Sequence, residues 1–461
     1  MNKIKEISFR LIKFPRYRLE EVFTPSKAAE INYVERIEID AQLSSEMSTP
    51  GKQIIVFGDS GSGKTSSVRN LLTKDNLKFI KTHCESSTTF EQLILNAFDE
   101  LNIFVVSGKS HKLSSTFKGD LAVEYKKIKA SIGEEYASED SKTYSRLLPP
   151  QLTPQKLAKF MGEGEIVWLI EDFHKVSPSE KIRIADVIKI FVDNANDYPI
   201  SKIICIGACQ SAHELIQLDP NLQTRVSEVS VPLLDDDEIK KIIINGFKFL
   251  NIVPSEELVA KLVYYSDNIG AFAHQMCMDI CKGEGIETTS FKKRKIDEST
   301  FHYAIEGFIK RSADTFKSIY EAATQNELGW YILTTFSRNA KKELSLKEIH
   351  KRVNKGKGTF DTSIITKKLE ELMGPSFNIV NYNSNSKKYS LSNPFWHRYL
   401  KVQFSIEMSE KQLNMKNKKN PRLQLSASDI KPKIKDDVDK SFYDLIIKLK
   451  NIESEMNNNH Y

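Results

Sequence analysis

Short apolar runs alternate with segments of helical periodicity over the first half of the chain. Residues 53–57 form a run of β-branched and aromatic side chains between Gly51 and Gly58. Similar runs lie at 79–82, 166–170, 202–206 and 228–231. Segments with apolar residues at helical spacing precede them at 28–43 and separate them at 64–72, 89–101 and 179–196. Strands that alternate with helices predict an α/β fold with a parallel sheet covered on both faces.

The pattern becomes helical after residue 232, where we expect the strands to stop. Three predicted helices, at 235–250, 255–266 and 271–281, form a small helical lid. Three more, at 328–336, 344–353 and 362–373, are followed by strands at 377–380 and 388–391. Three helices and a β-hairpin in this order predict a winged helix-turn-helix.

Polar segments divide the chain into predicted parts, because such segments cannot bury enough apolar surface to pack. The parts are a leader at 1–31 (extended over 1–26), an α/β core at 32–232 with an insertion near 106–148, the lid at 233–283, a linker and helix at 284–327, the winged helix at 328–404, and a basic tail with a terminal helix at 405–461. The linker contains Lys292-Lys293-Arg294-Lys295, which we expect to be solvated; a nuclear-import signal is the alternative.

Composition excludes several classes of protein. Hydrophobic residues make up 40% of the 461 residues, and no apolar run approaches the ~20 residues that span a bilayer. The charged first residues lack an apolar signal core. Five cysteines, an odd number, indicate reduced thiols instead of a disulfide framework. We therefore expect a cytoplasmic protein with no membrane partner.

The net charge of +6 is unevenly distributed. Residues 341–388 hold eleven Lys/Arg and five Asp/Glu, and residues 408–435 hold eight and two. Each segment thus carries +6, and the rest of the chain sums to −6. A basic C-terminal third favours an acidic partner such as nucleic acid. A surface that is only solvated explains the same charge equally well.

One glycine-rich motif carries specific chemistry. The segment 58–65, Gly-Asp-Ser-Gly-Ser-Gly-Lys-Thr, fits G-x-x-x-x-G-K-[ST] between a predicted strand and a predicted helix, the context of a P-loop. Glycines let backbone N–H groups wrap phosphates, Lys64 reaches the β- and γ-phosphates, and the Thr65 hydroxyl ligates Mg²⁺. The predicted ligands of ATP are Gly58, Asp59, Ser60, Gly61, Ser62, Gly63, Lys64, Thr65 and Ser66. The predicted fold is a P-loop NTPase sheet with a helical lid, followed by a winged helix-turn-helix.

Two acids follow the apolar run at 166–170. Acids at such a strand end hold Mg²⁺ and orient the attacking water. We assign the metal role to Glu171 and the water role to Asp172. In the alternative interpretation Ser177 or Ser179 caps the next helix and the two acids are merely solvated.

Four motifs carry a resemblance to a known family. They are the P-loop, Glu171-Asp172-Phe173-His174, Ile206-Gly207-Ala208 and Thr224-Arg225-Val226-Ser227-Glu228-Val229. With them, the stretch from residue 32 to about residue 281 resembles the AAA+ and STAND branches of P-loop ATPases, in particular bacterial ATP-binding proteins close to the origin-recognition clade. The winged helix adds to the resemblance. It implies ATP hydrolysis with Mg²⁺.

The resemblance also implies two roles around the nucleotide. Tyr33 and Val34 sit where the family packs its adenine base, although an ordinary helix end is equally open. Gln210 follows the fourth predicted strand, near the family's polar γ-phosphate sensor. The expected sensor position lies slightly earlier, where this chain has Gly207 and Ala208.

Three further residues complete the candidate set. Arg225 precedes the fifth predicted strand, where the family often places a catalytic arginine that reaches a neighbouring subunit's phosphate. His274 stands in the lid where an arginine sensor is usual; this favours slow turnover, and a structural role is the alternative. For His174, beside the two acids, we expect a supporting or structural role, because no nucleophile is nearby.

Three functions remain as alternatives. The first is an ATP-dependent switch that couples nucleotide state to homo-oligomerisation and to recruitment of a separate effector protein. The second is an ATP-dependent DNA-binding factor of initiator or loader type. Its phosphate contacts would be Lys351, Arg352, Lys355, Lys387 and Lys388 of the winged helix. The third is an anti-phage or transposition-type ATPase.

Overall fold

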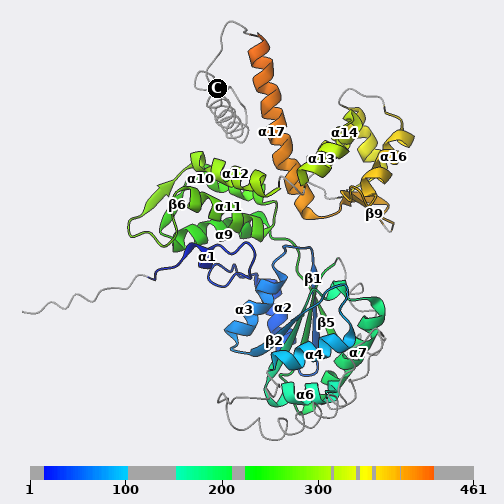
Figure 1. Cartoon of the computed structure of the whole chain (residues 1–461). Coiled ribbons are helices and arrows are strands. Elements are labelled where there is room, and N and C mark those ends of the chain that lie inside the picture. The colour runs from blue at the N-terminus through cyan, green and yellow to red at the C-terminus, as the bar shows by residue number, and fades with distance from the viewer. Residues whose placement is uncertain are drawn as a thin grey trace, which may run out of the picture. The chain divides into compact units, whose positions relative to one another are not determined.

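The computed structural model describes residues 15–101, 152–209, 224–312, 316–338, 343–355, 360–384 and 386–419. They belong to two compact units (Figure 1). The α/β unit, as we call it below, is Glu35–Leu233, and the C-terminal unit joins the segment before Glu35 to the chain from Leu234 onward. The predicted insertion at 106–148, Gln210 and the predicted terminal helix at 441–452 lie outside the described residues.

A five-stranded sheet in the order β2-β3-β4-β1-β5 forms the centre of the α/β unit. Its strands are β1 (Gln53–Gly58), β2 (Lys78–His83), β3 (Ile166–Glu171), β4 (Ile203–Ala208) and β5 (Val226–Ser230). Every paired neighbour is parallel, which confirms the predicted α/β fold class. The carboxyl ends of all five strands therefore meet at one edge of the sheet, and Gly58 lies directly beside Ala208 there.

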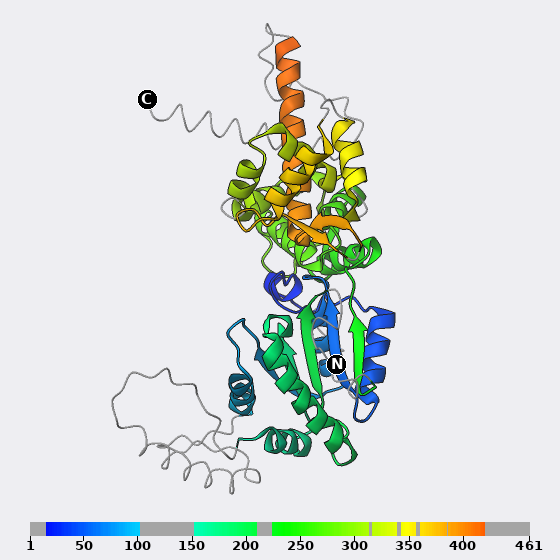
Figure 2. The same cartoon turned by 90° about the vertical axis from the view of Figure 1, so that its right-hand side faces the viewer.

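Helices cover both faces of this sheet (Figure 2). They are α2 (Ile37–Ser48) and α3 (Lys64–Lys74) on one face, and α4 (Phe90–Glu100), α6 (Pro154–Glu163) and α7 (Pro178–Asp193) on the other. Side chains alternate between the faces along each strand: Val167 and Leu169 pack with α3, whereas Trp168 and Ile170 pack with α4 and α7. Strands buried on both faces are nearly continuous in apolar residues, which is why the sequence pattern identified them.

The first half of the C-terminal unit is a helical cluster. It contains α1 (Leu19–Val22), α9 (Asp236–Phe249), α10 (Glu256–Ser266), α11 (Gly270–Gly283), η4 (Glu298–Thr300) and α12 (Phe301–Ser312). The expectation that strands stop after residue 232 is wrong, because β6 (Ile252–Pro254) pairs in parallel with β7 (Arg294–Ile296). Thus Arg294 and Lys295 of the predicted solvated run belong to a strand, and Arg294 pairs with Glu284.

The segment before residue 35 also departs from its prediction. Leu19, Val22 and Phe23 are buried in the core of the C-terminal unit, so the extended leader predicted over 1–26 is wrong at α1. The ring of Phe23 packs edge-on against Phe247 of α9. A four-residue helix has too few positions to show periodicity, and its apolar residues pack against a segment more than 200 residues away.

The second half of the C-terminal unit contains the three predicted helices and the predicted hairpin in the predicted order, with one further helix before them and one after them. The elements are α13 (Ser318–Ala323), α14 (Glu327–Ser337), β8 (Glu343–Leu344), α15 (Leu346–Asn354), α16 (Thr362–Met373), β9 (Val380–Asn383), β10 (Lys388–Leu391) and α17 (Pro394–Lys419). The short β8 adds a third strand, in the order β8-β10-β9. Helix α17 continues beyond residue 404, where a basic tail was predicted. None of the helices within the described residues is both long and apolar enough to cross a bilayer.

Candidate phosphate-binding site

The glycine-rich segment 58–66 links the carboxyl end of β1 to α3. Gly58, Gly61 and Gly63 have φ values of 146°, 81° and 90°, which residues with side chains rarely adopt. A Cβ atom on Gly58 would also lie 2.1 Å from the Val231 carbonyl oxygen. Gly63 is the N-cap of α3, so the loop passes directly into a helix N-terminus. This backbone has the positive-φ glycines and the helix N-terminus that binding of a phosphate requires.

Lys64 is buried within its own loop. Its Nζ donates to the carbonyl oxygens of Gly58, at 2.9 Å, and Asp59, at 2.7 Å. Burial lowers the pKa of Lys64, and the nearby Asp59, Cys209 and Asp172 counteract this shift. A phosphate anion beside this ammonium would compensate its lost hydration better than two carbonyl oxygens do.

Two buried polar atoms in this region have no hydrogen-bond partner among the described residues. They are the Ser62 hydroxyl oxygen and Oε1 of Glu171. A buried polar atom without a partner costs about 1–3 kcal/mol. A nucleotide with its cation fits both atoms, since a hydroxyl donates to phosphate and a carboxylate oxygen ligates Mg²⁺.

Glu171 ends β3 and is buried, with 9% of its surface exposed. Its Oε2 lies 3.2 Å from Nδ1 of His83 and 3.7 Å from Nζ of Lys81, both on the neighbouring β2. By strand alternation it shares the face of Val167 and Leu169, which α3 covers. The alternative in which this acid is merely solvated is therefore wrong for Glu171.

Asp172 differs from its neighbour in both conformation and exposure. It adopts a left-handed backbone with φ of 57° and pairs with Nζ of Lys175 at 2.8 Å. Its side chain is 46% exposed, and its charge acts on Lys64. The structure thus brings Asp172 close to the P-loop lysine, at the same edge of the sheet.

His174 links the segment after β3 to the end of β4. Its Nδ1 accepts a hydrogen bond from the backbone N–H of Ala208 at 3.1 Å. Ala208 is the β4 residue that pairs with Gly58, so this imidazole lies beside the start of the loop.

Arg36 makes hydrogen bonds to the glycine-rich loop that the sequence analysis did not predict. It is buried, and its Nη1 donates to the carbonyl oxygens of Ser62, at 3.2 Å, and Pro232, at 2.9 Å. Its Nη2 donates to Leu233 at 3.4 Å, and its backbone N–H donates to Asp40. Because the acceptors of the guanidinium are carbonyl oxygens, no residue type in the sequence signals them. Arg36 ties the glycine-rich loop to the last residues of the α/β unit.

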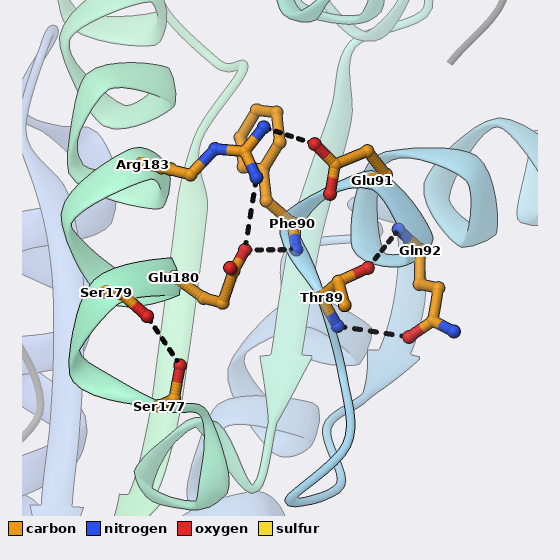
Figure 3. Close-up of polar contacts among 8 residues, drawn as sticks. All are labelled: Thr89, Phe90, Glu91, Gln92, Ser177, Ser179, Glu180 and Arg183. Atoms are coloured by element: carbon orange, nitrogen blue, oxygen red, sulfur yellow. Dashed lines mark hydrogen bonds and ion pairs between the residues drawn. The ribbon is translucent and has the colours of Figure 1, made fainter. Parts of the chain in front are cut away.

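A polar cluster holds the turns after β2 and β3 together on the other face of the sheet (Figure 3). Glu180 on α7 accepts from the backbone N–H of Phe90 at 2.7 Å and pairs with Arg183. Arg183 also pairs with Glu91 and lies 4.2 Å above the Phe90 ring. Ser177 occupies the N-cap of α7 without a side-chain capping bond; its hydroxyl contacts Ser179. The cluster joins the starts of α4 and α7, the helices that follow β2 and β3.

Arg225 lies at the opposite edge of the sheet from the loop. It precedes β5, whose first residue pairs with Gln53 at the start of β1. A strand of five residues spans about 17 Å at roughly 3.3 Å per residue. Arg225 pairs with Asp193 at 3.3 Å, and its side chain is about half exposed. It therefore lies too far from segment 58–66 of the same chain to contact a phosphate bound there.

The remaining predicted ligands belong to the C-terminal unit. Val34 is buried in that unit's core, and Tyr33 is half-buried. His274 on α11 is buried, accepts from the backbone N–H of Thr24 at 3.1 Å, and packs against Phe23. Burial lowers the pKa of His274 to about 4, which keeps the ring neutral. These contacts favour the structural alternative for His274 over nucleotide sensing.

Comparisons with known proteins returned solved structures alone. No protein-family model and no curated protein matches the chain. A Walker-type ATPase of Pyrococcus abyssi is 14% identical, with a TM-score of 0.45, over 81% of this chain and 97% of its own. Cdc6p of Pyrobaculum aerophilum is 14% identical, with a TM-score of 0.39, over 83% and 98%.

The ORC1 protein of Aeropyrum pernix, solved in complex with DNA, is 12% identical, with a TM-score of 0.42, over 84% of this chain and 96% of its own. Because the TM-scores lie below 0.5, this similarity is no basis for assigning a function. A function has to be inferred from the residues of the chain itself.

Proposed function

We propose that this protein binds ATP with Mg²⁺ at segment 58–66 and hydrolyses it slowly. The observation that carries the proposal is the loop itself: three glycines at positive φ, a buried Lys64, and the unpartnered Ser62 hydroxyl and Glu171 Oε1. Lys64 would hold the β- and γ-phosphates, while Thr65 and Glu171 would hold Mg²⁺. The cation would neutralise phosphate charge, and Asp172 would orient the attacking water.

We further propose that ATP acts as a switch signal, in the manner of AAA+ and STAND proteins. Arg36 supports this, because it joins the Ser62 carbonyl of the loop to Pro232 and Leu233, where the chain leaves the α/β unit. A shift of the loop on nucleotide binding would therefore also move Pro232 and Leu233. The switch would promote homo-oligomerisation and recruit a separate cytoplasmic effector, with anti-phage defence or mobile-element biology as the setting.

The proposal of ATP binding is tested with Lys64→Ala. The variant should lose at least about 100-fold in ATP affinity, because no other group can replace the buried ammonium at the phosphates. Isothermal titration with ATP and Mg²⁺ measures this, and the melting temperature checks the fold. The matched control is Lys74→Ala in the last turn of the same helix, where the exposed lysine pairs only with Glu35 among the described residues. Equal ATP affinities for both variants would contradict the site.

A second function, ATP-dependent DNA binding, is favoured by exposed cations in the C-terminal unit. Lys351, Arg352 and Lys355 lie at the end of α15, and Lys387 and Lys388 lie on the β9–β10 hairpin; all five are exposed. In a winged helix these positions would contact phosphates and would not read bases. Mass photometry with and without ATP, Mg²⁺ and duplex DNA separates nucleotide-driven assembly from DNA-driven assembly.

Replacing those five cations with alanine sharpens the DNA alternative. Each phosphate contact contributes a slope of about −0.9 to log K against log salt, so the slope should flatten by several units. Binding should weaken alike for all duplex sequences, as fluorescence anisotropy over a salt series would show. If the variant with all five alanines bound duplex DNA with wild-type affinity at about 150 mM salt, the winged helix would serve protein contacts. The switch would then remain as the function.

A further inference from the structure

The imidazole of His174 has a defined tautomer. Its Nδ1 accepts the backbone N–H of Ala208 at 3.1 Å, so in the neutral ring the proton resides on Nε2. Burial lowers the pKa of His174; Lys175, Lys64 and Lys181 add to the effect, and Asp172 opposes it. At neutral pH the ring is therefore uncharged and carries one N–H donor.

This donor lies at the phosphate-binding edge of the sheet. Ala208 is paired with Gly58 across parallel strands, which run about 4.8 Å apart. The ammonium of Lys64 is near enough to act on the imidazole, and Asp172 acts on both groups. Within the described residues, no acceptor bonds to Nε2. The hydrogen bonds of His174 are made by two other atoms: Nδ1 accepts from the Ala208 amide, and the backbone carbonyl oxygen accepts from Lys181.

A terminal phosphate is the chemistry that this arrangement suits. Charge builds on the γ-phosphate oxygens during transfer, and fixed N–H donors aimed at them stabilise the transition state. The end of β4 contributes no polar side chain, since Gly207 and Ala208 stand there. A neutral donor held by a backbone hydrogen bond supplies one without adding a charge that would tighten ADP binding as well.

We propose that His174 donates its Nε2–H to the γ-phosphate of ATP and so distinguishes ATP from ADP. This rests on the proposed ATPase function of the same site. It gives His174 a direct role where the sequence indicated a supporting or structural one. A purely structural role, in which the ring only ties the turn after β3 to β4, is the competing explanation.

Three substitutions separate the two roles. In His174→Asn, the amide oxygen lies near the former Nδ1 position and keeps the bond to Ala208, but no donor reaches the former Nε2 position. In His174→Gln, the longer amide places an N–H near that position. His174→Ala removes both groups. His302→Ala, on α12 of the C-terminal unit, controls for the loss of a histidine.

The measurements are single-turnover ATP hydrolysis and titrations with ADP and with a non-hydrolysable ATP analogue. If Nε2–H contacts the γ-phosphate, the Ala and Asn variants lose on the order of 100-fold in hydrolysis rate, and Gln recovers most of it. The preference for the ATP analogue over ADP should fall by about tenfold or more in Ala and Asn, while ADP affinity stays within about twofold.

Two results would overturn the assignment. One is an Asn variant as active as Gln, which would mean that the bond to Ala208 suffices. The other is a parallel loss of ADP and analogue affinity, which would mean that the variants damage the loop. If wild-type protein bound neither nucleotide, the ATPase proposal itself would fail, and this is distinct from either result.

Discussion

The two edges of the sheet each hold a buried lysine with the same hydrogen-bond pattern. Lys64, at the carboxyl edge, donates to the carbonyl oxygens of Gly58 and Asp59. Lys202, just before β4 at the amino edge, donates to those of Thr49 and Lys52, the latter at 3.0 Å. Burial lowers the pKa of both lysines, that of Lys202 to about 8.

Their surroundings differ. Around Lys64 lie the carboxylates of Asp59 and Asp172, together with the unpartnered Ser62 hydroxyl and Glu171 Oε1. At the amino edge, Glu46 is the charged neighbour that acts on Lys202 among the residues that the structure describes, and Lys202 satisfies the carbonyls that follow α2. The same pair of hydrogen bonds thus completes the fold at the amino edge, whereas at the carboxyl edge it leaves buried polar atoms without partners among the described residues.

The largest effect is expected from the acids at the carboxyl edge. Asp172→Asn should keep ATP bound but slow hydrolysis by about 100–1,000-fold, because it removes the group that orients water. Glu171→Gln should instead weaken Mg²⁺-dependent binding, because a neutral amide is a poor ligand for a hard cation. Titrations with and without Mg²⁺, followed by single-turnover assays, separate the two. Reversed phenotypes would exchange the roles of the two residues.

A stability loss without a binding loss is expected at the amino edge. Lys202→Met preserves side-chain volume but leaves two backbone carbonyl oxygens without their donor. The free energy of unfolding should fall by about 1–3 kcal/mol in urea denaturation. ATP affinity should stay at the wild-type value, the opposite of Lys64→Ala. A loss of ATP affinity in Lys202→Met would erase the distinction between the two edges.

The lowered pKa of Lys202 also predicts a pH dependence. Below about pH 8 the lysine is protonated in both folded and unfolded states, so its contribution is constant. Between about 8 and the ordinary value of 10.5, the unfolded chain binds the proton and the folded protein does not. Wild-type stability should therefore rise relative to Lys202→Met across this window. Denaturation at pH 7.5 and pH 10 measures the difference, and a constant difference would contradict the lowered pKa.

The smallest effect on ATP binding is expected for Arg225→Ala, within about twofold of wild type, because the residue lies at the far edge from its own loop. If Arg225 reaches a neighbour's phosphate, the variant should lose ATP-driven assembly or turnover. Mixing it with Lys64→Ala protein should then restore part of the activity, because one interface receives an intact loop and an intact arginine.

Asp193→Asn is the control for that experiment. It breaks the exposed Arg225–Asp193 pair, which is worth at most about 1 kcal/mol, and leaves the arginine in place. Assembly should persist in Asp193→Asn. If both variants fail alike and mixing rescues neither, Arg225 acts only within its own subunit.

Strands β1, β3 and β4 were predictable because they are buried on both faces and therefore consist of nearly unbroken apolar runs. The helix predicted over 28–43 begins instead at Ile37 and ends at Ser48, because residues before it turn into the C-terminal unit. Strands β6 and β7 were missed because three residues carry no periodicity. Both misses depend on contacts with distant segments, which local pattern does not encode.

The candidate site shows the same division. Spacing alone identified Gly58, Gly63 and Lys64, because the motif is defined by residue types that phosphate binding requires. The contributions of Arg36 and His174 are hydrogen bonds with backbone groups 196 and 34 residues away. Any residue presents the same backbone amide and carbonyl, so no signal in the sequence marks these pairs.

The split origin of the C-terminal unit has a consequence for how the chain is made. Leu19 donates its backbone N–H to Glu287, and Thr24 donates its own to His274. At roughly 5–20 residues per second, a ribosome needs on the order of 10–50 s to extend the chain from residue 24 to residue 274. The apolar side chains of Leu19, Val22 and Phe23 stay without their native partners for that time. This segment is thus synthesised well before the partners that bury it, and it is exposed to chaperones and proteases while the whole α/β unit is translated.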